Sequence, residues 1–347
     1  MKFSMFFFSA DGTTDSKDKY TMMKECARFA DQHALTAIWT PERHFDAFGG
    51  LYPNPSVTSA ALAMITERIK IRAGSIVLPL QDPLRVAEEW AVVDNLSGGR
   101  VEVAFASGWH VNDFVLNPAE YENRRQQMFE KIEIVKELWG GQPVYRINGE
   151  GKEVPIYVYP RPLQKTLPVW ITCQSDETFV KCGEMGANVL TNFSGKRVED
   201  LARKIRLYRR AMIRGGHDPV TGQVALMMHT FVGKDEQTVR EKVKKAYGSY
   251  LLHNLELQRK HAEEETLSED EKESLISHAV DRLFQTNGLV GTPSSCVKIV
   301  ERFKEIGVTE IACLVDFGIE VDEVLESLPL LNQVIENFAK ETEVTWV

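Results

Sequence analysis

Short apolar runs alternate with amphipathic, helix-length stretches along almost the whole chain. Eight runs have the length of a strand, at residues 3–8, 37–40, 69–76, 101–105, 169–173, 187–191, 224–232 and 310–315. Continuous apolar runs predict strands buried on both faces, and the long connections between them predict parallel pairing. Eight such units predict an α/β fold, a (β/α)8 TIM barrel in a single domain over residues 1–347. A doubly wound open sheet is the alternative, although no G-x-G-x-x-G follows a strand.

Two insertions interrupt the repeated units. Residues 141–162 predict a β-hairpin, because Ile156-Tyr157-Val158-Tyr159 alternates as a strand does. Residues 259–278 are polar, with the acidic runs Glu263-Glu264-Glu265 and Glu269-Asp270-Glu271. Two interpretations of this second segment stay open: a solvated helix face, and a mobile loop that closes over the mouth of the barrel as a lid.

Composition and charge exclude several classes of protein. With 41 Lys+Arg against 50 Asp+Glu, the formal net charge is −9, which argues against a nucleic-acid partner. No apolar run approaches the roughly 18 residues that a membrane-spanning helix needs. The apolar N-terminus predicts a buried first strand and not a signal peptide, because Asp11 follows at once and no cleavage pattern fits. The 5 cysteines lack C-x-x-C spacing, so we expect reduced thiols and a cytoplasmic protein.

Candidate chemistry follows from the rule that barrel enzymes work at the C-terminal ends of their strands. The segments selected are Pro41-Glu42-Arg43-His44-Phe45, Gly74-Ser75, Ala106-Ser107-Gly108-Trp109-His110, Gln174-Ser175-Asp176-Glu177-Thr178 and Asn192-Phe193. His44 is a candidate general acid or base because histidine titrates near neutrality, and a structural histidine bonded to a carbonyl is the alternative. His110 and His229 meet the same positional test more weakly.

Ser175 and Thr178 open a helix directly after a strand, where free backbone N–H groups and hydroxyls suit a phosphate. Simple helix capping explains the same two residues equally well. No pair of histidines or carboxylates has metal-binding spacing, so no metal site is expected. No G-x-S-x-G elbow occurs, which argues against a serine hydrolase.

Several motifs stand in register along nearly the whole chain. They are residues 39–54 with Thr40-Pro41-Glu42-Arg43-His44-Phe45, residues 74–79 followed by 82–88, residues 94–100 leading to Ser107-Gly108-Trp109, and Gly291-Thr292-Pro293. Together they resemble the bacterial luciferase-like flavin monooxygenases. Arg161-Pro162-Leu163-Gln164 and residues 311–318 are most similar to the luciferase-like monooxygenase domains of polyketide and nonribosomal peptide biosynthesis.

The resemblance implies that reduced FMN binds at the mouth of the barrel. By position, Gly74 and Ser75 match a non-proline cis peptide against the flavin ring, and Gln174, Ser175 and Thr178 match the phosphate site. His44 matches the catalytic histidine, Asp113 an acidic residue near the flavin, and Phe193 an aromatic wall of the site. His110 joins the catalytic candidates by its position at a strand end alone.

Two positions depart from the luciferase pattern. Ser107 stands where luciferase has an arginine, so a cation for the phosphate is either missing or supplied from elsewhere. Ala106 stands where luciferase has a reactive cysteine, and light emission is not expected. Both residues are nevertheless expected to border the cofactor.

The activity implied by the resemblance is that of a two-component monooxygenase. A flavin reductase would deliver reduced FMN, which reacts with O2 to give a flavin peroxide for Baeyer–Villiger insertion or hydroxylation. The substrate would be a natural-product intermediate, either a small molecule or one bound to a carrier protein acting in trans. A homodimer is expected through helices near residues 55–67 and 82–96. The alternatives are a deazaflavin-dependent reductase or dehydrogenase and a non-catalytic flavin-binding protein.

Overall fold

The computed structural model describes residues 1–8, 19–193, 197–259 and 268–339. Within these residues, eight parallel strands close a barrel, as predicted. In their order around the ring they are β1 (Lys2–Phe6), β2 (Ala37–Thr40), β3 (Lys70–Val77), β4 (Val101–Ala106), β7 (Val169–Thr172), β8 (Asn188–Asn192), β9 (Val224–Val232) and β11 (Glu310–Leu314). The ring closes because β9 pairs with both β8 and β11, and β11 pairs with β1.

One strand was not predicted. The short strand β10 (Gly288–Gly291) pairs in parallel with the last four residues of β9, beyond the part of β9 that pairs with β8. Only two apolar residues lie between its flanking glycines, so its hydrophobic run is too short to stand out in the sequence. The bounds of the eight predicted strands agree with those of the structure to within two residues.

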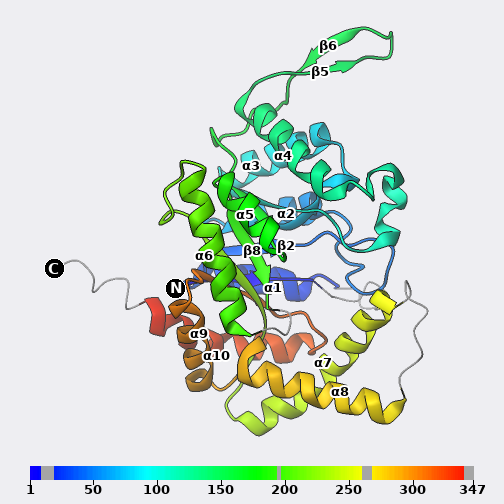
Figure 1. Ribbon diagram of the computed structural model, residues 1–347. Coiled ribbons are helices and arrows are strands. Elements are labelled where there is room, and N and C mark those ends of the chain that lie inside the picture. The colour runs from blue at the N-terminus through cyan, green and yellow to red at the C-terminus, as the bar shows by residue number, and fades with distance from the viewer. Residues whose placement is uncertain (9–18, 194–196, 260–267, 340–347) are drawn as a thin grey trace, which may run out of the picture.

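Helices cover the outside of the barrel (Figure 1). They are α1 (Thr21–Gln32), α2 (Pro55–Ala63), α3 (Pro83–Ser97), α4 (Arg124–Gly140), α5 (Asp176–Glu184), α6 (Val198–Arg214), α7 (Glu236–Arg259), α8 (Glu269–Arg282), α9 (Pro293–Glu305) and α10 (Val321–Ala339). Local chemistry sets several of their starts. Asp82, for example, caps α3 by accepting from Leu84 N over 2.8 Å, and Pro83 occupies the first helical position. Within the described residues, no helix is long and apolar enough to cross a membrane.

The described parts of both insertions contain secondary structure. β5 (Val144–Ile147) and β6 (Glu153–Ile156) form the predicted antiparallel hairpin, which projects from the barrel (Figure 1), although the strand ends at Ile156 and does not continue to Tyr159. In the second insertion, Glu269-Asp270-Glu271 lie exposed in the first turn of α8, so the solvated helix face is confirmed there. Glu263-Glu264-Glu265 lie outside the described residues, and the lid stays a prediction.

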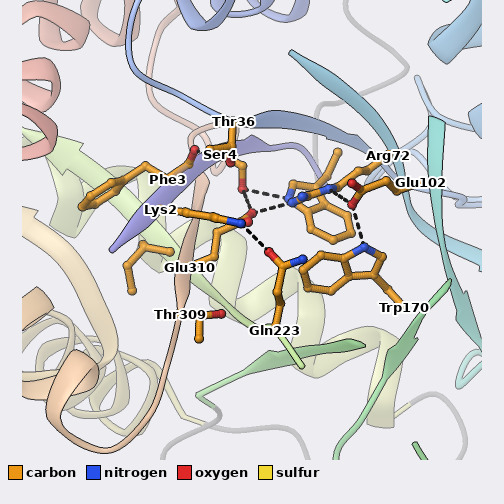
Figure 2. A network of polar contacts seen from close by, with 12 residues as sticks. Lys2, Phe3, Ser4, Thr36, Arg72, Glu102, Trp170, Gln223, Thr309 and Glu310 are labelled. Carbon is orange, nitrogen blue, oxygen red and sulfur yellow. Dashed lines mark hydrogen bonds and ion pairs between the residues drawn. The ribbon is translucent and has the colours of Figure 1, made fainter. Parts of the chain in front are cut away.

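A buried charged network fills the barrel at the N-terminal ends of its strands (Figure 2). Arg72 of β3 pairs with Glu102 of β4 and Glu310 of β11, each over 2.7 Å. Its guanidinium lies 4.7 Å from the ring centroid of Trp39 and 4.6 Å from that of Trp170. Burial would lower the pKa of Arg72, but the two carboxylates outweigh it and raise the pKa. This network closes one end of the barrel, and the opposite end is left for a ligand.

Candidate functional site

A cavity of about 370 Å³ lies at the C-terminal ends of the barrel strands, where function was expected. Its size falls in the range of ligand pockets, about 300–1,000 Å³. Residues at the ends of β1, β2, β3, β4, β7, β8 and β9 line it, and Tyr250 of α7 adds a wall from outside the barrel. A larger hollow of about 610 Å³ lies between α7 and α8, but it is open, mostly lined by charged side chains and away from the strand ends.

Small residues shape one side of this cavity. The Gly74–Ser75 peptide bond is cis, the geometry that the resemblance implied. A Cβ at Gly74 would lie 2.9 Å from the Cβ of Trp39, so only glycine fits there. Gly108 has a positive φ of 80°, and a Cβ on it would lie 2.8 Å from Val77. With Ser75 and Ala106, these glycines form a group of small residues in the cavity wall.

The start of α5 carries the capping arrangement that the sequence allowed. Ser175 Oγ accepts from the backbone N–H of Thr178 over 3.2 Å, and Thr178 Oγ1 accepts from that of Ser175 over 3.1 Å. The two hydroxyl oxygens lie 2.9 Å apart. The capping interpretation is thus confirmed, and phosphate binding at the same residues stays a prediction.

Helix α6 brings two cations to this helix start. Arg203 Nη2 donates to Asp176 Oδ1 over 2.9 Å, and Lys204 Nζ donates to the backbone carbonyl of Gln174. Gln174 in turn lines the cavity and donates to Asn192 Oδ1 over 2.8 Å. Sequence reasoning missed both cations, because α6 lies far along the chain from the loop after β7.

The predicted residues divide into two groups. Gly74, Ser75, Ala106 and Gln174 lie together in the cavity wall. Ser107, Ser175, Thr178, Phe193, His44, His110 and Asp113 lie outside the set that lines it. Phe193 packs edge-to-face on Phe303 of α9 with ring centroids 5.5 Å apart, and it lines a small pocket beside the cavity together with Gln174 and Lys204.

His44 is tied to a buried carboxylate that does line the cavity. Its Nε2 lies 2.9 Å from Glu42 Oε1, which also accepts from Gln81 Nε2 over 2.5 Å. The second oxygen of Glu42 accepts from the backbone N–H of Val77 over 2.7 Å. The partner of His44 is therefore a carboxylate and not the backbone carbonyl of the structural alternative.

His110 and Asp113 form a second buried pair behind the cavity wall. His110 Nδ1 lies 2.9 Å from Asp113 Oδ1, and both residues are buried. The ring of Trp109, which lines the cavity, lies 5.3 Å from that of His110. The pair therefore borders the cavity through Trp109.

His229 is unsuited to acid–base chemistry at neutral pH. Burial among the rings of Tyr247, Tyr250 and Phe317, all with centroids within 5.3 Å, lowers the pKa of His229 to about 3. The imidazole therefore stays neutral throughout the physiological range. We conclude that the weaker candidate His229 belongs to the packing of β9 against α7.

Arg43 is the residue that sequence reasoning passed over. It lines the cavity, is only 6% exposed, and its guanidinium lies 4.6 Å from the Phe8 ring, 5.1 Å from Trp109 and 5.2 Å from Phe48. A signal for it was present in the sequence. That signal was its place in the loop directly after β2, which ends at Thr40, and its neighbours Pro41 and Glu42 line the cavity with it.

The barrel and its cavity define an enzyme of the TIM-barrel class, and comparison with known proteins narrows this class. A sequence model of the luciferase-like monooxygenase family matches residues 1–310. The chain therefore belongs to that family and is a flavin-dependent oxidoreductase of the monooxygenase type. The oxygenase component of a flavin-dependent trigonelline monooxygenase from Acinetobacter baylyi is 23% identical over 356 residues, with 98% of this chain and 96% of that protein covered.

Solved structures share the fold. The monooxygenase RslO1 from Streptomyces bottropensis superposes with a TM-score of 0.82 at 22% identity, covering 98% of this chain and 100% of the other. The oxygenating constituent of 3,6-diketocamphane monooxygenase from Pseudomonas putida, in complex with FMN, gives 0.75 at 18% identity, covering 96% and 97%. An F420-dependent secondary alcohol dehydrogenase gives 0.70 at 17% identity, covering 96% and 98%. The fold alone therefore does not choose between FMN and F420.

Proposed function

We propose that this protein is the oxygenase component of a two-component, FMN-dependent monooxygenase that acts on an intermediate of natural-product biosynthesis. The observation that carries the proposal is the cavity at the strand ends, whose wall includes the small residues Gly74, Ser75, Ala106 and Gly108. A flavin ring is flat and needs such a surface over its whole width. The relative from Acinetobacter baylyi, itself named an oxygenase component, supports a separate reductase as partner.

The polar residues present fit FMN. Gln174 and Asn192 offer amide groups at one side of the cavity, and Ser75 Oγ lies 2.5 Å from Thr172 Oγ1 in the same wall. Mixed donors and acceptors of this kind suit the edge of a flavin ring, whose nitrogens and carbonyls alternate in the same way. The cavity volume is sufficient for a ring system but not for a whole dinucleotide.

The FMN phosphate would lie at the start of α5. The N-terminus of a helix favours an anion, because its first N–H groups have no partner within the helix. Asp176 in the first turn would oppose a phosphate, but Arg203 pairs with that carboxylate. Lys204, held at the carbonyl of Gln174, is the cation that takes the place of the arginine missing at Ser107. Ser175 and Thr178 would turn their hydroxyls from each other to the phosphate.

The protein side of the chemistry rests on Glu42 and His44. When bound in its reduced form, FMN supplies the electrons that activate O2. Glu42 faces the cavity and His44 lies behind it, so the pair can hold a proton near the reacting oxygen and return it. Phe6, Phe8 and Trp109 keep the cavity apolar and exclude water.

An elongated substrate suits the surroundings of this cavity. A second cavity of about 290 Å³ adjoins the first and shares Tyr250 with it. Phe48, Phe317 and Lys245 are among the residues that line it. An acyl chain, either free or tethered to a carrier protein, could extend from the reaction site into this space. Together with the resemblance to biosynthetic domains, this favours a natural-product intermediate.

The experiment that tests the proposal is oxygen incorporation. The protein is mixed with FMN, a flavin reductase and NADH under ¹⁸O2, with candidate acyl and aromatic substrates, and products are analysed by mass spectrometry. A gain of one ¹⁸O atom per product supports monooxygenation. Tight binding of F420 but not FMN, with hydride transfer and no O2 uptake, would establish the deazaflavin alternative. Flavin binding without turnover of any substrate would favour the non-catalytic protein.

A further inference from the structure

Arg43 is a buried cation that forms no ion pair with a carboxylate of the described residues. Its side chain is almost fully enclosed, and Nη1 has no hydrogen-bond partner within the described residues. Nη2 donates to the carbonyl of Phe48 over 3.5 Å, a long and weak contact. Burial lowers the pKa of Arg43, but a guanidinium remains charged in proteins, so the cost of burial is not relieved by loss of the proton.

The nearest carboxylates have other partners. Asp113 and Asp46 act on Arg43 through their charges, which oppose the lowering of its pKa by burial. Asp113 pairs with His110 over 2.9 Å, and Asp46 pairs with His253 over 2.9 Å. The fold therefore places the positive charge of Arg43 at the cavity, while the two nearby carboxylates pair with histidines. The aromatic rings around Arg43 stabilise its charge. Its N–H groups that lack a hydrogen-bond partner would be satisfied by an anionic oxygen.

We propose that Arg43 binds a carboxylate of the substrate at the aromatic side of the cavity, an inference that rests on the proposed function. A guanidinium and a carboxylate are both planar and match in charge and in the spacing of donors and acceptors. Tyr250 lines the same cavity, and burial raises the pKa of its hydroxyl, which therefore remains a neutral donor. A phosphate needs more donors than Arg43 and Tyr250 provide, and the FMN phosphate has its own site at α5.

The rings beside Arg43 indicate which chemical group of the substrate is attached to the carboxylate. Phe8 and Trp109 line the cavity next to the guanidinium, so the group attached to the carboxylate contacts aromatic surface. A flat aromatic or unsaturated acid makes the best use of this surface. Arg43 thus orients the substrate by its acid group and directs the rest of the molecule toward the wall at Gly74 and Ser75.

The test compares benzoate with its neutral analogue benzamide. Calorimetric titrations are made on the flavin-free and on the FMN-loaded protein. We expect wild-type protein to bind benzoate at least about tenfold more tightly than benzamide. Arg43→Gln should weaken benzoate binding by about ten- to a hundredfold and leave benzamide nearly unchanged. Arg214→Gln, which alters an exposed arginine paired with Glu184, is the matched control and should change neither.

Several outcomes would overturn the inference. The inference is wrong if wild-type protein binds benzoate and benzamide with equal affinity. It is also wrong if Arg43→Gln keeps the wild-type preference for benzoate over benzamide. If thermal unfolding shows that Arg43→Gln does not fold, Arg43→Lys is tested in its place. Lysine keeps the positive charge but lacks the planar guanidinium that binds a carboxylate through two hydrogen bonds. A preference reduced severalfold in Arg43→Lys supports the inference, and an identical preference overturns it. Failure of FMN to bind would reject the proposed function, while the flavin-free titrations still test Arg43.

Discussion

His44 Nε2 lies 2.9 Å from Glu42 Oε1, and Glu42, not His44, forms part of the cavity wall. The carboxylate also accepts from Val77 N and from Gln81 Nε2, so it is held by three donors at the junction of β2 and β3. In the proposed function, a proton from His44 therefore reaches the cavity through Glu42. We propose that the pair, and not the histidine alone, acts on a ligand.

We predict that His44→Ala reduces the coupling of O2 consumption to product formation by about 10- to 100-fold while FMN still binds, because the proton held by the pair is lost. Stopped-flow spectra should show that O2 is still consumed, with H2O2 as the main product. His217→Ala, which removes a half-buried histidine bonded to the Glu184 carbonyl away from the cavity, should leave coupling unchanged.

A second variant separates proton transfer from positioning of Glu42. His44→Asn keeps a side-chain N–H donor in this position but cannot carry a proton at neutral pH. Coupling should stay low in His44→Asn if the histidine moves a proton. Full recovery of coupling in this variant would show that His44 only positions the carboxylate.

Much of the fold could be predicted, because strands buried on both faces appear as short apolar runs between amphipathic helices. The strand-end rule selected Gly74, Ser75, Ala106 and Gln174, which lie together in one cavity wall, and cofactor binding by them stays a prediction. Arg43 was missed because it lies in the loop after β2, where no strand pattern tells which side chains face the cavity. Tyr250 could not be predicted at all, because it reaches the cavity from a helix far along the chain, where no local pattern marks it.

Protonation of His229 should make stability depend on pH. Its pKa is lowered to about 3 in the folded protein, whereas the unfolded chain has the ordinary value near 6.5. The unfolded state therefore binds more protons between these values, and stability falls as the pH drops from about 6.5 toward 3. The loss is roughly 1.4 kcal/mol per pH unit in this window. Urea unfolding at pH 6.5, 5.5 and 4.5 measures it.

His229→Leu removes the titrating group and provides the comparison. Other carboxylates and histidines titrate in both proteins, so only the difference between the two pH profiles reports on His229. We expect the variant to lose about 2–3 kcal/mol less than wild-type protein between pH 6.5 and 4.5. Parallel profiles would mean that the ring takes up a proton in the folded state without cost.

Removal of Arg72 should destabilise the barrel strongly. Arg72→Met leaves Glu102 and Glu310 buried without their cation, which costs about 3–5 kcal/mol. Urea unfolding at pH 7 is the measurement, and Arg85→Met, which breaks an exposed pair on α3, should cost less than about 1 kcal/mol. Combining Arg72→Met with Glu102→Gln and Glu310→Gln should recover most of the loss. If the triple variant is as unstable as Arg72→Met alone, the loss of stability comes from the packing of Arg72 between Trp39 and Trp170 and not from the unpaired carboxylates.

FMN binding should depend on the hydroxyls at the start of α5. Ser175→Ala/Thr178→Ala should weaken FMN binding by about ten- to a hundredfold, and Lys204→Met should act in the same direction. Fluorescence titration of flavin gives the affinities. The double variant Thr292→Ala/Ser295→Ala breaks an equivalent capping box on α9 and serves as the control. It should lose similar stability, about 1 kcal/mol per cap, with unchanged FMN affinity. Unchanged FMN affinity in Ser175→Ala/Thr178→Ala would show that the phosphate binds at another site.

The homodimer expected through α2 and α3 depends on a stripe that the structure leaves exposed. Val57, Ala61 and Met64 face solvent at helical spacing on and just after α2, and Val92 and Leu96 do so on α3. Other apolar residues in these segments, such as Val86 and Trp90, are buried in the core. The apolar residues on which the dimer was predicted therefore lie on two faces of the helices, one buried and one exposed.

We predict that Val57→Asp/Met64→Asp converts a dimer into a monomer with its fold intact, because two charges on each copy would be buried at the interface without partners. Light scattering coupled to gel filtration at micromolar concentration gives the mass, and far-UV circular dichroism checks the fold. Ile213→Asp changes an equally exposed apolar residue on α6 and should leave the dimer unchanged. A wild-type protein that elutes as a monomer would reject the dimer, and a double variant that stays dimeric would place the interface on another face.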